Sequence, residues 1–494
     1  MSFTTLHFFL FLAMGVLIYY LLPKKLQWVW LLVLSYLYYF TFSIKTSVFL
    51  IFTTVVTYTG GILLTRMNES SKAYLAANKE TLDRAAKKAY KEKVKKNKRR
   101  VVVAMLLLCF GLLGVVKYLN FVIENIDALV LAVGHGQYFE PVNIILPLGI
   151  SFYTFQSISY IIDVYQGKYS AEKNIFKYAL FVSFFPQILS GPISKASSLL
   201  PQIKGERTFD PVETVQGLKQ ILWGLFLKVV MADRVGLYVD SIFDNYIYNS
   251  GASCLLASIF YTFQIYGDFA GYSLIAIGVG RLMGFNLINN FRRPYLAVSI
   301  TDFWHRWHIS LSIWLKDYVY IPLGGNRCSK MRNYWNIFVT FLISGIWHGA
   351  NWTFVVWGIL HGVFQIIEKA LGLQYSQVKG IVRVGRMTIT FLLVNFAWII
   401  FRMPSIADGW NVTAKIFTDL ISPLSLSSKT DMLLSFSSIL MVILVDCVTE
   451  FVPQDRLQIV GRHAAVRWSV YIFLLCAILL CGVFDAGQFI YVSF

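Results

Sequence analysis

The sequence predicts an all-α integral membrane protein, and three observations support this fold class. The chain has 494 residues, of which 57% are hydrophobic and only 14% are charged. Its mean hydropathy is +0.60, and soluble globular domains do not have such a composition. Apolar stretches close to the ~20 residues that a helix needs to cross a bilayer recur along the whole chain. We therefore expect about eleven transmembrane helices, with re-entrant or interfacial helices among them, in one polytopic domain of residues 1–494.

The candidate spans follow one another from the first residues to the last. We place them at 6–22, 27–43, 47–64, 101–118, 143–164, 176–190, 213–232, 254–283, 300–320, 335–361, 387–403, 433–452 and 467–484. The first has no basic segment before it and no small-residue cleavage site after it, which favours a permanent span over a signal peptide. The six cysteines are scattered without ligand spacing, so we expect neither disulfides nor a metal site.

Positive charge is concentrated in one segment. Residues 65–100 hold thirteen Lys or Arg and four Asp or Glu, and so supply +9 of the net charge of +18. Because basic segments beside spans stay in the cytoplasm, this segment is predicted to be a cytoplasmic loop or helix. Lys24 and Lys25, after the first span, share that side by parity, which puts the N-terminus outside. The basic face also offers a docking place for an acidic carrier protein or an anionic cofactor, but its position beside a span does not indicate nucleic acid.

Prolines and glycines interrupt several spans. The interruptions are at Pro147, Gly149, Pro186, Gly191 and Pro192. Polar residues share the first of these broken segments, namely Ser151, Thr154, Gln156, Ser157, Ser159 and Asp163. Non-helical backbone at membrane depth is tolerated where protein surrounds it or where it lines a water-filled cavity. An inner cavity fits an enzyme with a buried site or a transporter, although we find no internal repeat that favours the transporter.

Two histidine motifs lie in apolar, aromatic surroundings, where ionisable side chains are costly and usually functional. The first spans residues 304–310, with the sequence WHRWHIS. If residues 300–320 form one helix, four polar residues share one face and five apolar residues the other. The polar face holds His305, His308, Ser312 and Lys316, and the apolar face holds Trp304, Trp307, Leu311, Trp314 and Tyr318. Asp302 and Arg306 have the i, i+4 spacing of an ion pair.

The second motif centres on His348, which lies between Gly345 and Gly349. These glycines let the backbone bend or let another group approach closely. Trp347 and Trp352 provide bulky walls, and Asn351 offers a hydrogen-bonding side chain. A single histidine in an apolar segment is usually a packed core residue, but two motifs beside broken spans favour catalysis. His361 follows in the next apolar stretch with less support. The two histidines of the first motif could ligate a metal, but no carboxylate or cysteine accompanies them at ligand spacing, so no metal is expected.

Several longer segments resemble the membrane-bound O-acyltransferase family. They are residues 147–152, 190–193, 269–273, 290–295, 302–326 and 347–352, together with WGILHG at 357–362. The run PLGGN at 322–326 is similar to the family's bacterial polysaccharide branch, which includes alginate O-acetyltransferases. The resemblance covers nearly the whole chain. One departure is His305, because that branch more often has arginine there, and this makes His305 doubtful as a catalytic residue.

The resemblance implies a ring of tilted helices around a central funnel or tunnel, with an acyl thioester entering from the cytoplasm. The family's two histidines correspond to His348 and His308. Chemically, a neutral imidazole can take the proton of an attacking hydroxyl, and burial keeps histidine neutral. We therefore expect His348 to be the general base, and His308 to orient it or to stabilise the developing charge. Asn351 is a candidate for an oxyanion site, and Ser312, Trp347 and His361 are possible supporting residues.

The last residues, 485–494, form an aromatic motif in which Tyr491 lies between Phe489 and Phe494. Such residues often anchor a chain at the membrane interface. The pattern F-x-Y-x-x-F also resembles C-termini of bacterial cell-envelope acyl-transfer proteins, in which the tyrosine hydroxyl relays the acyl group. Tyr491 is therefore a candidate acyl carrier as well as a candidate anchor.

The leading functional prediction is an acyltransferase of the bacterial cytoplasmic membrane. It moves acetyl from a cytosolic thioester, either acetyl-CoA or an acyl-carrier thioester, towards an extracytoplasmic polysaccharide, with no tightly bound cofactor. The expected partners are membrane lipids, an extracytoplasmic acyltransferase or the polysaccharide itself, and a cytosolic carrier protein, but not nucleic acid. D-alanyl transfer from a carrier protein to teichoic acid is the alternative within this class. A transporter or channel is the alternative from another class, but it leaves the histidine motifs unexplained.

Overall fold

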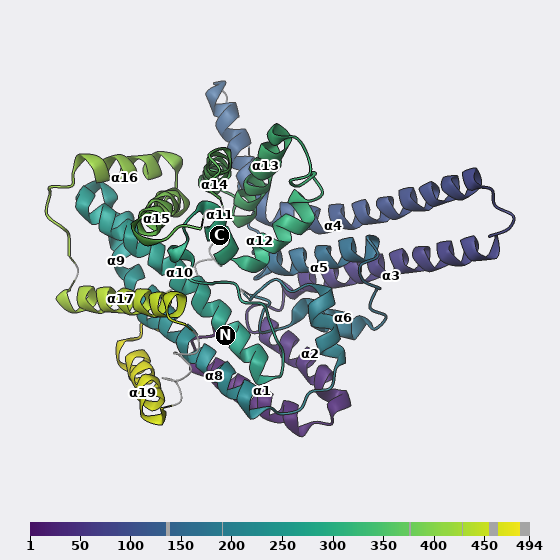
Figure 1. Cartoon of the computed structure of the whole chain (residues 1–494), viewed down its shortest axis with the longest axis horizontal. Coiled ribbons are helices and arrows are strands. Elements are labelled where there is room, and N and C mark those ends of the chain that lie inside the picture. The colour runs from purple at the N-terminus through teal and green to yellow at the C-terminus, as the bar shows by residue number, and fades with distance from the viewer. Residues whose placement is uncertain (135–138, 190, 375–376, 427, 454–462, 485–494) are drawn as a thin grey trace. The chain divides into compact units, whose positions relative to one another are not determined.

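The computed structural model describes residues 1–134, 139–189, 191–374, 377–426, 428–453 and 463–484. These residues form helices joined by turns and irregular segments, with no strand among them (Figure 1), so the predicted all-α class is confirmed. The chain divides into two compact units. The N-terminal unit comprises Met1 and residues 10–210 and 283–287, and the C-terminal unit comprises residues 2–9, 211–282 and 288–494. The single domain expected from the sequence stays a prediction.

Within the described part of the first 210 residues, seven helices begin. They are α1 (Leu6–Leu21), α2 (Lys24–Phe40), α3 (Ser47–Ala77), α4 (Arg84–Ala132), α5 (Ile150–Tyr165), α6 (Ile175–Ser183) and α7 (Ala196–Lys204). The rest of the chain forms α8 (Pro211–Leu225), η1 (Phe226–Ala232), α9 (Asp233–Phe243), η2 (Tyr246–Tyr248), α10 (Gly251–Leu282), η3 (Pro294–Leu296), α11 (Ile300–Arg306), α12 (Ile309–Leu315), η4 (Lys316–Tyr320), α13 (Lys330–His348), α14 (Trp352–Ala370), α15 (Gly380–Arg402), α16 (Ile406–Thr418), α17 (Lys429–Phe451) and α19 (Ala464–Cys481).

Five of the described helices are long and apolar enough to cross a membrane, namely α3, α4, α15, α17 and α19. Only 11% of the apolar stretch of α19 and 17% of that of α4 is buried within the protein. Apolar surface of this extent is unfavourable in water and is characteristic of lipid-facing helices. The chain is therefore a multi-pass membrane protein, and the count of about eleven spans stays a prediction.

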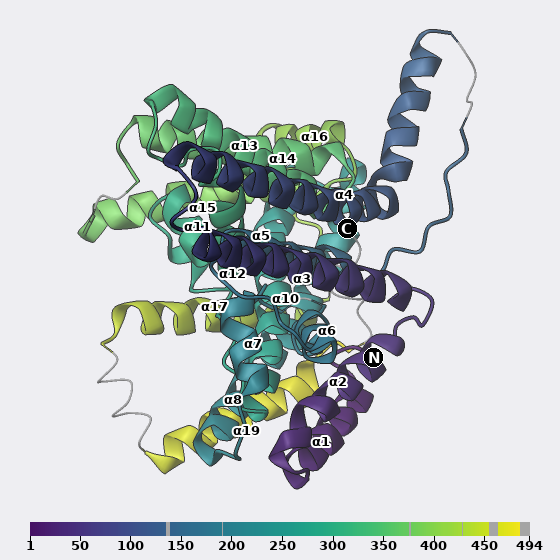
Figure 2. The ribbon, with the colours of Figure 1, turned by 90° about the vertical axis from the view of Figure 1, so that its right-hand side faces the viewer.

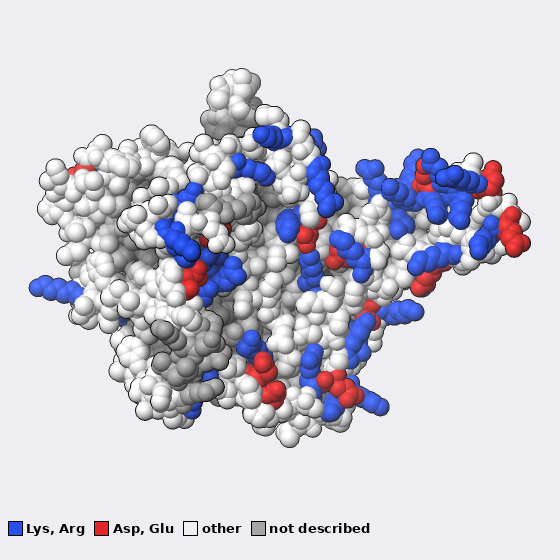
Figure 3. Space-filling view, in the orientation of Figure 1, with Lys and Arg blue, Asp and Glu red and all other residues white. Residues whose placement is uncertain are grey.

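In the N-terminal unit, α3 and α4 form a long antiparallel hairpin (Figures 1 and 2). The rings of Tyr74 and Tyr90 stack across it with centroids 4.3 Å apart. Asp83 caps α4 by accepting a hydrogen bond from the Ala86 N–H at 2.6 Å. Lys and Arg gather on the outer part of the hairpin (Figure 3). The basic segment 65–100 is thus the end of α3, a short turn and the start of α4.

The interruption predicted at Gly149 is present, because α5 begins directly after it. Gly149 has φ +73°, and a Cβ there would lie 2.2 Å from the Ile188 carbonyl oxygen. Buried polar side chains of α5 and of the segment that follows α6 form hydrogen bonds with one another. Gln187 donates to the Gln156 side-chain oxygen at 2.9 Å, and Ser194 donates to Gln187 at 2.9 Å. In this part of the N-terminal unit, protein groups satisfy the Gln156 and Gln187 side chains.

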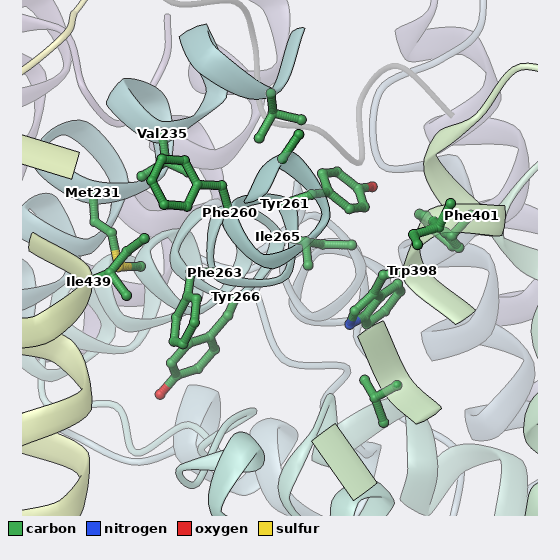
Figure 4. Close-up of a cluster of buried hydrophobic side chains, with 14 of the residues drawn as sticks. Met231, Val235, Phe260, Tyr261, Phe263, Ile265, Tyr266, Trp398, Phe401 and Ile439 are labelled. Atoms are coloured by element: carbon green, nitrogen blue, oxygen red, sulfur yellow. The ribbon is translucent and has the colours of Figure 1, made fainter. Parts of the chain in front are cut away.

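In the C-terminal unit, α10 is the central helix and packs against α8, α9 and η1. Glycines allow α8 and α10 to approach closely: a Cβ on Gly224 would lie 2.7 Å from the Gly271 carbonyl oxygen. Small residues serve such close crossings in membrane helix pairs. Aromatic residues of α10, including Phe263 and Tyr266, form one buried cluster with Trp398 of α15 (Figure 4).

Candidate active site

The first histidine motif is split between two helices, so the prediction of one continuous helix over 300–320 is wrong. α11 ends at Arg306 and α12 begins at Ile309. Between them, His308 has φ 41°, in the left-handed region. The four polar residues therefore do not share a helical face. His308 is fully buried, whereas His305 and Lys316 are exposed.

Asn290 holds this break in place. The Ile309 N–H donates to the Asn290 carbonyl oxygen at 2.9 Å, and the Ser310 N–H donates to Asn290 Oδ1 at 3.2 Å. The side chain of Asn290 thus caps α12, a role that the His308 side chain does not fill. The left-handed conformation costs ~1–2 kcal/mol for an L-residue, and these bonds offset that cost. No local pattern in the sequence indicates this role of Asn290, because its partner lies twenty residues away.

His308 is enclosed by aromatic rings. Its ring centroid lies 4.6 Å from that of Phe269 on α10, with the rings nearly perpendicular. It lies 6.0 Å from the centroid of Trp347 on α13. Four residues of the predicted apolar face, Trp304, Trp307, Leu311 and Trp314, are each at most 5% exposed, whereas the fifth, Tyr318, is partly exposed.

His348 is the last residue of α13 and is 3% exposed. Its imidazole centroid lies 5.0 Å from Trp347, 4.9 Å from Trp357 and 5.3 Å from Phe401. Trp347 therefore contacts both His308 and His348. The structure brings the two predicted catalytic histidines next to the same indole ring, although His308 lies in the break between α11 and α12 and His348 ends α13.

Glycines make room around His348. A Cβ on Gly345 would lie 2.3 Å from the Phe354 carbonyl oxygen, and one on Gly349 would lie 2.3 Å from the Phe354 ring. The predicted close approach is thus confirmed at both glycines. Gly349 has φ −175°, which any residue adopts, so this position needs glycine for space.

We expect Gly345→Ala to force α13 and α14 apart, because the new methyl group meets α14 backbone that cannot rotate away. Overpacking of this kind costs ~1–3 kcal/mol, and His348 lies on the next turn of the same helix. Thermal unfolding and acyl-transfer rate, measured on the same preparation, test this. Gly362→Ala is the matched control on the same helix pair, because its nearest neighbour would be 3.4 Å away. Equal stability of the two variants would contradict the role of this crossing.

His361 is a third buried imidazole in this cluster. The Trp304 indole N–H donates to His361 Nδ1 at 3.2 Å, so the neutral tautomer carries its proton on Nε2. His361 lies 4.7 Å from Trp357, which also contacts His348. His361 had less support from the sequence than the other two histidines, yet it and His348 both make a ring contact with Trp357.

The remaining predicted site residues have local structural contacts. Asn351 caps α14: its Oδ1 accepts from the Thr353 N–H at 2.9 Å, and its Nδ2 donates to the Pro404 carbonyl at 2.9 Å. Ser312 donates to the Trp307 carbonyl at 3.3 Å. Contribution of Asn351 to an oxyanion site stays a prediction, and Tyr491 lies outside the described residues. In the part of the chain that the structure describes, no three His, Cys, Asp or Glu are grouped to hold a metal ion.

Ion pairs connect α11, the helix that ends before His308, to α15 and α17. Arg306 pairs with Asp302 at 2.8 Å, as its spacing predicted. Arg306 also meets Glu450 of α17 at 3.1 Å. Glu450 further pairs with Arg293 at 2.7 Å and with Arg383 of α15 at 3.3 Å. One largely buried carboxylate thus ties α11 to α15 and α17.

A multi-pass helical fold with buried histidines around tryptophans defines a membrane protein with a candidate catalytic centre. Residues 170–407, which contain His308, His348 and His361, match the model of the membrane-bound O-acyltransferase family. A probable alginate O-acetylase of Pseudomonas aeruginosa is 37% identical over 410 residues, covering 83% of this chain and 73% of the relative. The chain belongs to the membrane-bound O-acyltransferase family, and the resemblance seen in the sequence is confirmed.

Two further relatives differ in the acyl group that their names state. A peptidoglycan O-acetyltransferase of Helicobacter pylori is 36% identical over 346 residues, covering 64% of each protein. A teichoic acid D-alanyltransferase of Bacillus subtilis is 27% identical over 270 residues, covering 53% of this chain and 68% of the relative. The O-acetylating relatives are thus more similar to this chain than the D-alanylating one.

Proposed function

We propose that this protein transfers an acetyl group from a cytosolic thioester towards hydroxyl groups of an extracytoplasmic cell-envelope polysaccharide. The pairing of His308 and His348 around Trp347, in a chain of this family, is the observation that carries the proposal. The names of the alginate- and peptidoglycan-acetylating relatives supply the acyl group and the acceptor class. We further propose the bacterial cytoplasmic membrane as its location, with the basic hairpin in the cytoplasm and the N-terminus outside.

In the proposed reaction, His348 is the general base. As a neutral imidazole it accepts the proton of the acceptor hydroxyl while the hydroxyl oxygen attacks the thioester carbonyl. The carbon–sulfur bond then breaks, the new ester forms, and the proton passes from the imidazolium to the departing thiolate. His308, which also contacts Trp347, orients the reacting groups or stabilises the developing charge. Acetyl-CoA or an acyl-carrier thioester is the donor substrate.

Tyr491 is the proposed first acceptor, from which an extracytoplasmic acyltransferase partner passes the acetyl group to the polymer. The described chain just before this segment is held firmly in the C-terminal unit. The Arg234 guanidinium donates to the Cys481 carbonyl at 2.6 and 3.1 Å, and the Val483 N–H donates to the Val229 carbonyl at 2.9 Å. These bonds hold the last described residues next to η1.

Peptide mass analysis of the full chain after incubation with acetyl-CoA tests the relay. We expect the peptide that contains Tyr491 to gain the mass of one acetyl group, because a tyrosine hydroxyl is a competent acyl acceptor. Tyr491→Phe keeps the aromatic ring without the hydroxyl and is the matched control.

The thioester that modifies the protein distinguishes acetyl transfer from D-alanyl transfer. Modification by a D-alanyl carrier protein, but not by acetyl-CoA, would favour D-alanyl transfer to teichoic acid. The absence of an adduct with either thioester would leave Tyr491 as an interface anchor only.

A further inference from the structure

A basic pocket of about 250 Å³ lies in the N-terminal unit, at the turn between α1 and α2. Four lysines from three helices line it, with Glu206 as the acidic residue on its wall. They are Lys24, Lys25, Lys177 and Lys204. Tyr19, Trp28 and Phe285 add an aromatic side to the pocket.

The acidic residues near the pocket compensate these charges only in part. Lys204 meets the buried carboxylate of Glu172 at 2.5 Å. Lys24 lies 3.9 Å from Glu206, but both side chains are at least half exposed, and such pairs contribute little. Among the described residues, no carboxylate lies within ion-pair distance of Lys25 or Lys177. The pocket therefore keeps an excess of positive charge.

The start of α2 adds to this positive potential. Lys24 and Lys25 are its first two residues, its first turn has no acidic residue, and no side chain caps it after Pro23. The N-terminus of a helix carries partial positive charge, where acidic side chains are favourable and lysines are not. An anion bound at this end would offset both the lysines and the helix dipole.

We propose that this pocket binds a phosphate group of a ligand whose apolar or aromatic part packs on Trp28 and Tyr19. Several lysines around one space suit a multiply charged anion, and lysine binds phosphate as a point charge. The pocket is smaller than the ~300–1,000 Å³ of sites that enclose a whole drug-sized ligand, so it holds the phosphate end only.

Two kinds of ligand have such a phosphate group. One is the nucleotide end of a CoA thioester, in which case the inference rests on the proposed function and makes the pocket part of donor binding. The other is the headgroup of an anionic phospholipid. Lys177 is already placed for either ligand, because its Nζ lies 5.3 Å from the centre of the Trp28 ring.

Binding to the purified full chain, by isothermal titration in a neutral detergent, tests the nucleotide source. The probes are adenosine 3′,5′-bisphosphate and CoA. Lys24→Gln with Lys25→Gln removes two pocket charges, and Lys45→Gln with Lys173→Gln removes two exposed charges from the same unit outside the pocket. We expect the pocket pair to weaken binding by about tenfold or more and the control pair to leave it nearly unchanged.

Native mass spectrometry from nanodiscs tests the lipid source. The discs contain phosphatidylcholine alone or with phosphatidylglycerol, and retained lipid is counted for the same variants. Loss of retained phosphatidylglycerol in the pocket pair only, without bisphosphate binding, identifies a lipid site. Equal behaviour of the pocket and control pairs in both measurements overturns the proposal.

Two further variants keep the result interpretable. Lys177→Gln replaces the pocket pair if that pair does not fold, whereas Lys204→Gln is unsuitable because it strands the buried Glu172 carboxylate. His348→Ala is expected to lose acyl transfer and keep bisphosphate or lipid binding. An error in the proposed function would therefore appear in the acyl-transfer measurement, and an error in the pocket proposal would appear in the binding measurements.

Discussion

We expect His348→Ala to lower the rate of thioester-dependent acyl transfer by about 10²–10⁴-fold, the usual contribution of a general base. The imidazole is the titratable group at the end of α13, and it is enclosed by Trp347, Trp357 and Phe401. Water has poor access to this position and cannot easily replace the base. Single-turnover kinetics with acetyl-CoA would measure the effect without the complication of product release.

Two variants separate loss of the base from loss of packing. His348→Gln keeps most of the side-chain volume between the three rings but cannot act as a base, so we expect it to fold and to be as inactive as the alanine variant. His305→Ala changes an exposed histidine of the neighbouring motif and is expected to keep normal activity. If a folded His348→Gln protein transferred acyl groups at the normal rate, His348 would not be the base.

The sequence predicted features that depend on local composition and spacing. The apolar stretches predicted the all-helical membrane class, the i, i+4 spacing predicted the Asp302–Arg306 pair, and the glycines beside His348 predicted a close approach by another group, which in the structure is Phe354. Each prediction rested on residues that lie near one another in the sequence. The pattern also placed Trp304 and Trp307 on the apolar face, and both are buried.

The break at His308 did not follow from the pattern, because its cause is distant in the sequence. Helical periodicity assumes continuous helical backbone, and no proline or glycine in residues 304–310 marks an interruption. The left-handed turn depends on bonds to Asn290, and the role of His361 depends on Trp304 from another helix. Contacts of this kind appear only when the helices are assembled in three dimensions.

A large loss of folding stability is expected on substitution of Lys228, which lies in the π-helix η1. Its Nζ lies 2.6 Å from Asp268 and 2.7 Å from Asp233, and the three side chains are 4%, 2% and 10% exposed. Lys228→Met removes the cation and strands two buried carboxylates. Breaking a buried ion pair in this way costs ~3–5 kcal/mol. Thermal unfolding in detergent is expected to show a large loss of stability, together with lost activity, because Asp268 precedes the Phe269 ring that contacts His308.

A matched control exists on α15. Arg402 also binds two carboxylates, Asp240 at 2.7 Å and Asp244 at 3.1 Å, but these are 55% and 60% exposed. Arg402→Met therefore leaves carboxylates that water can solvate, and we expect a loss of only ~0–1 kcal/mol. Adding Asp268→Asn to Lys228→Met removes one stranded charge and is expected to recover part of the stability. Equal unfolding temperatures for Lys228→Met and Arg402→Met would mean that burial does not set the strength of the Lys228 pairs.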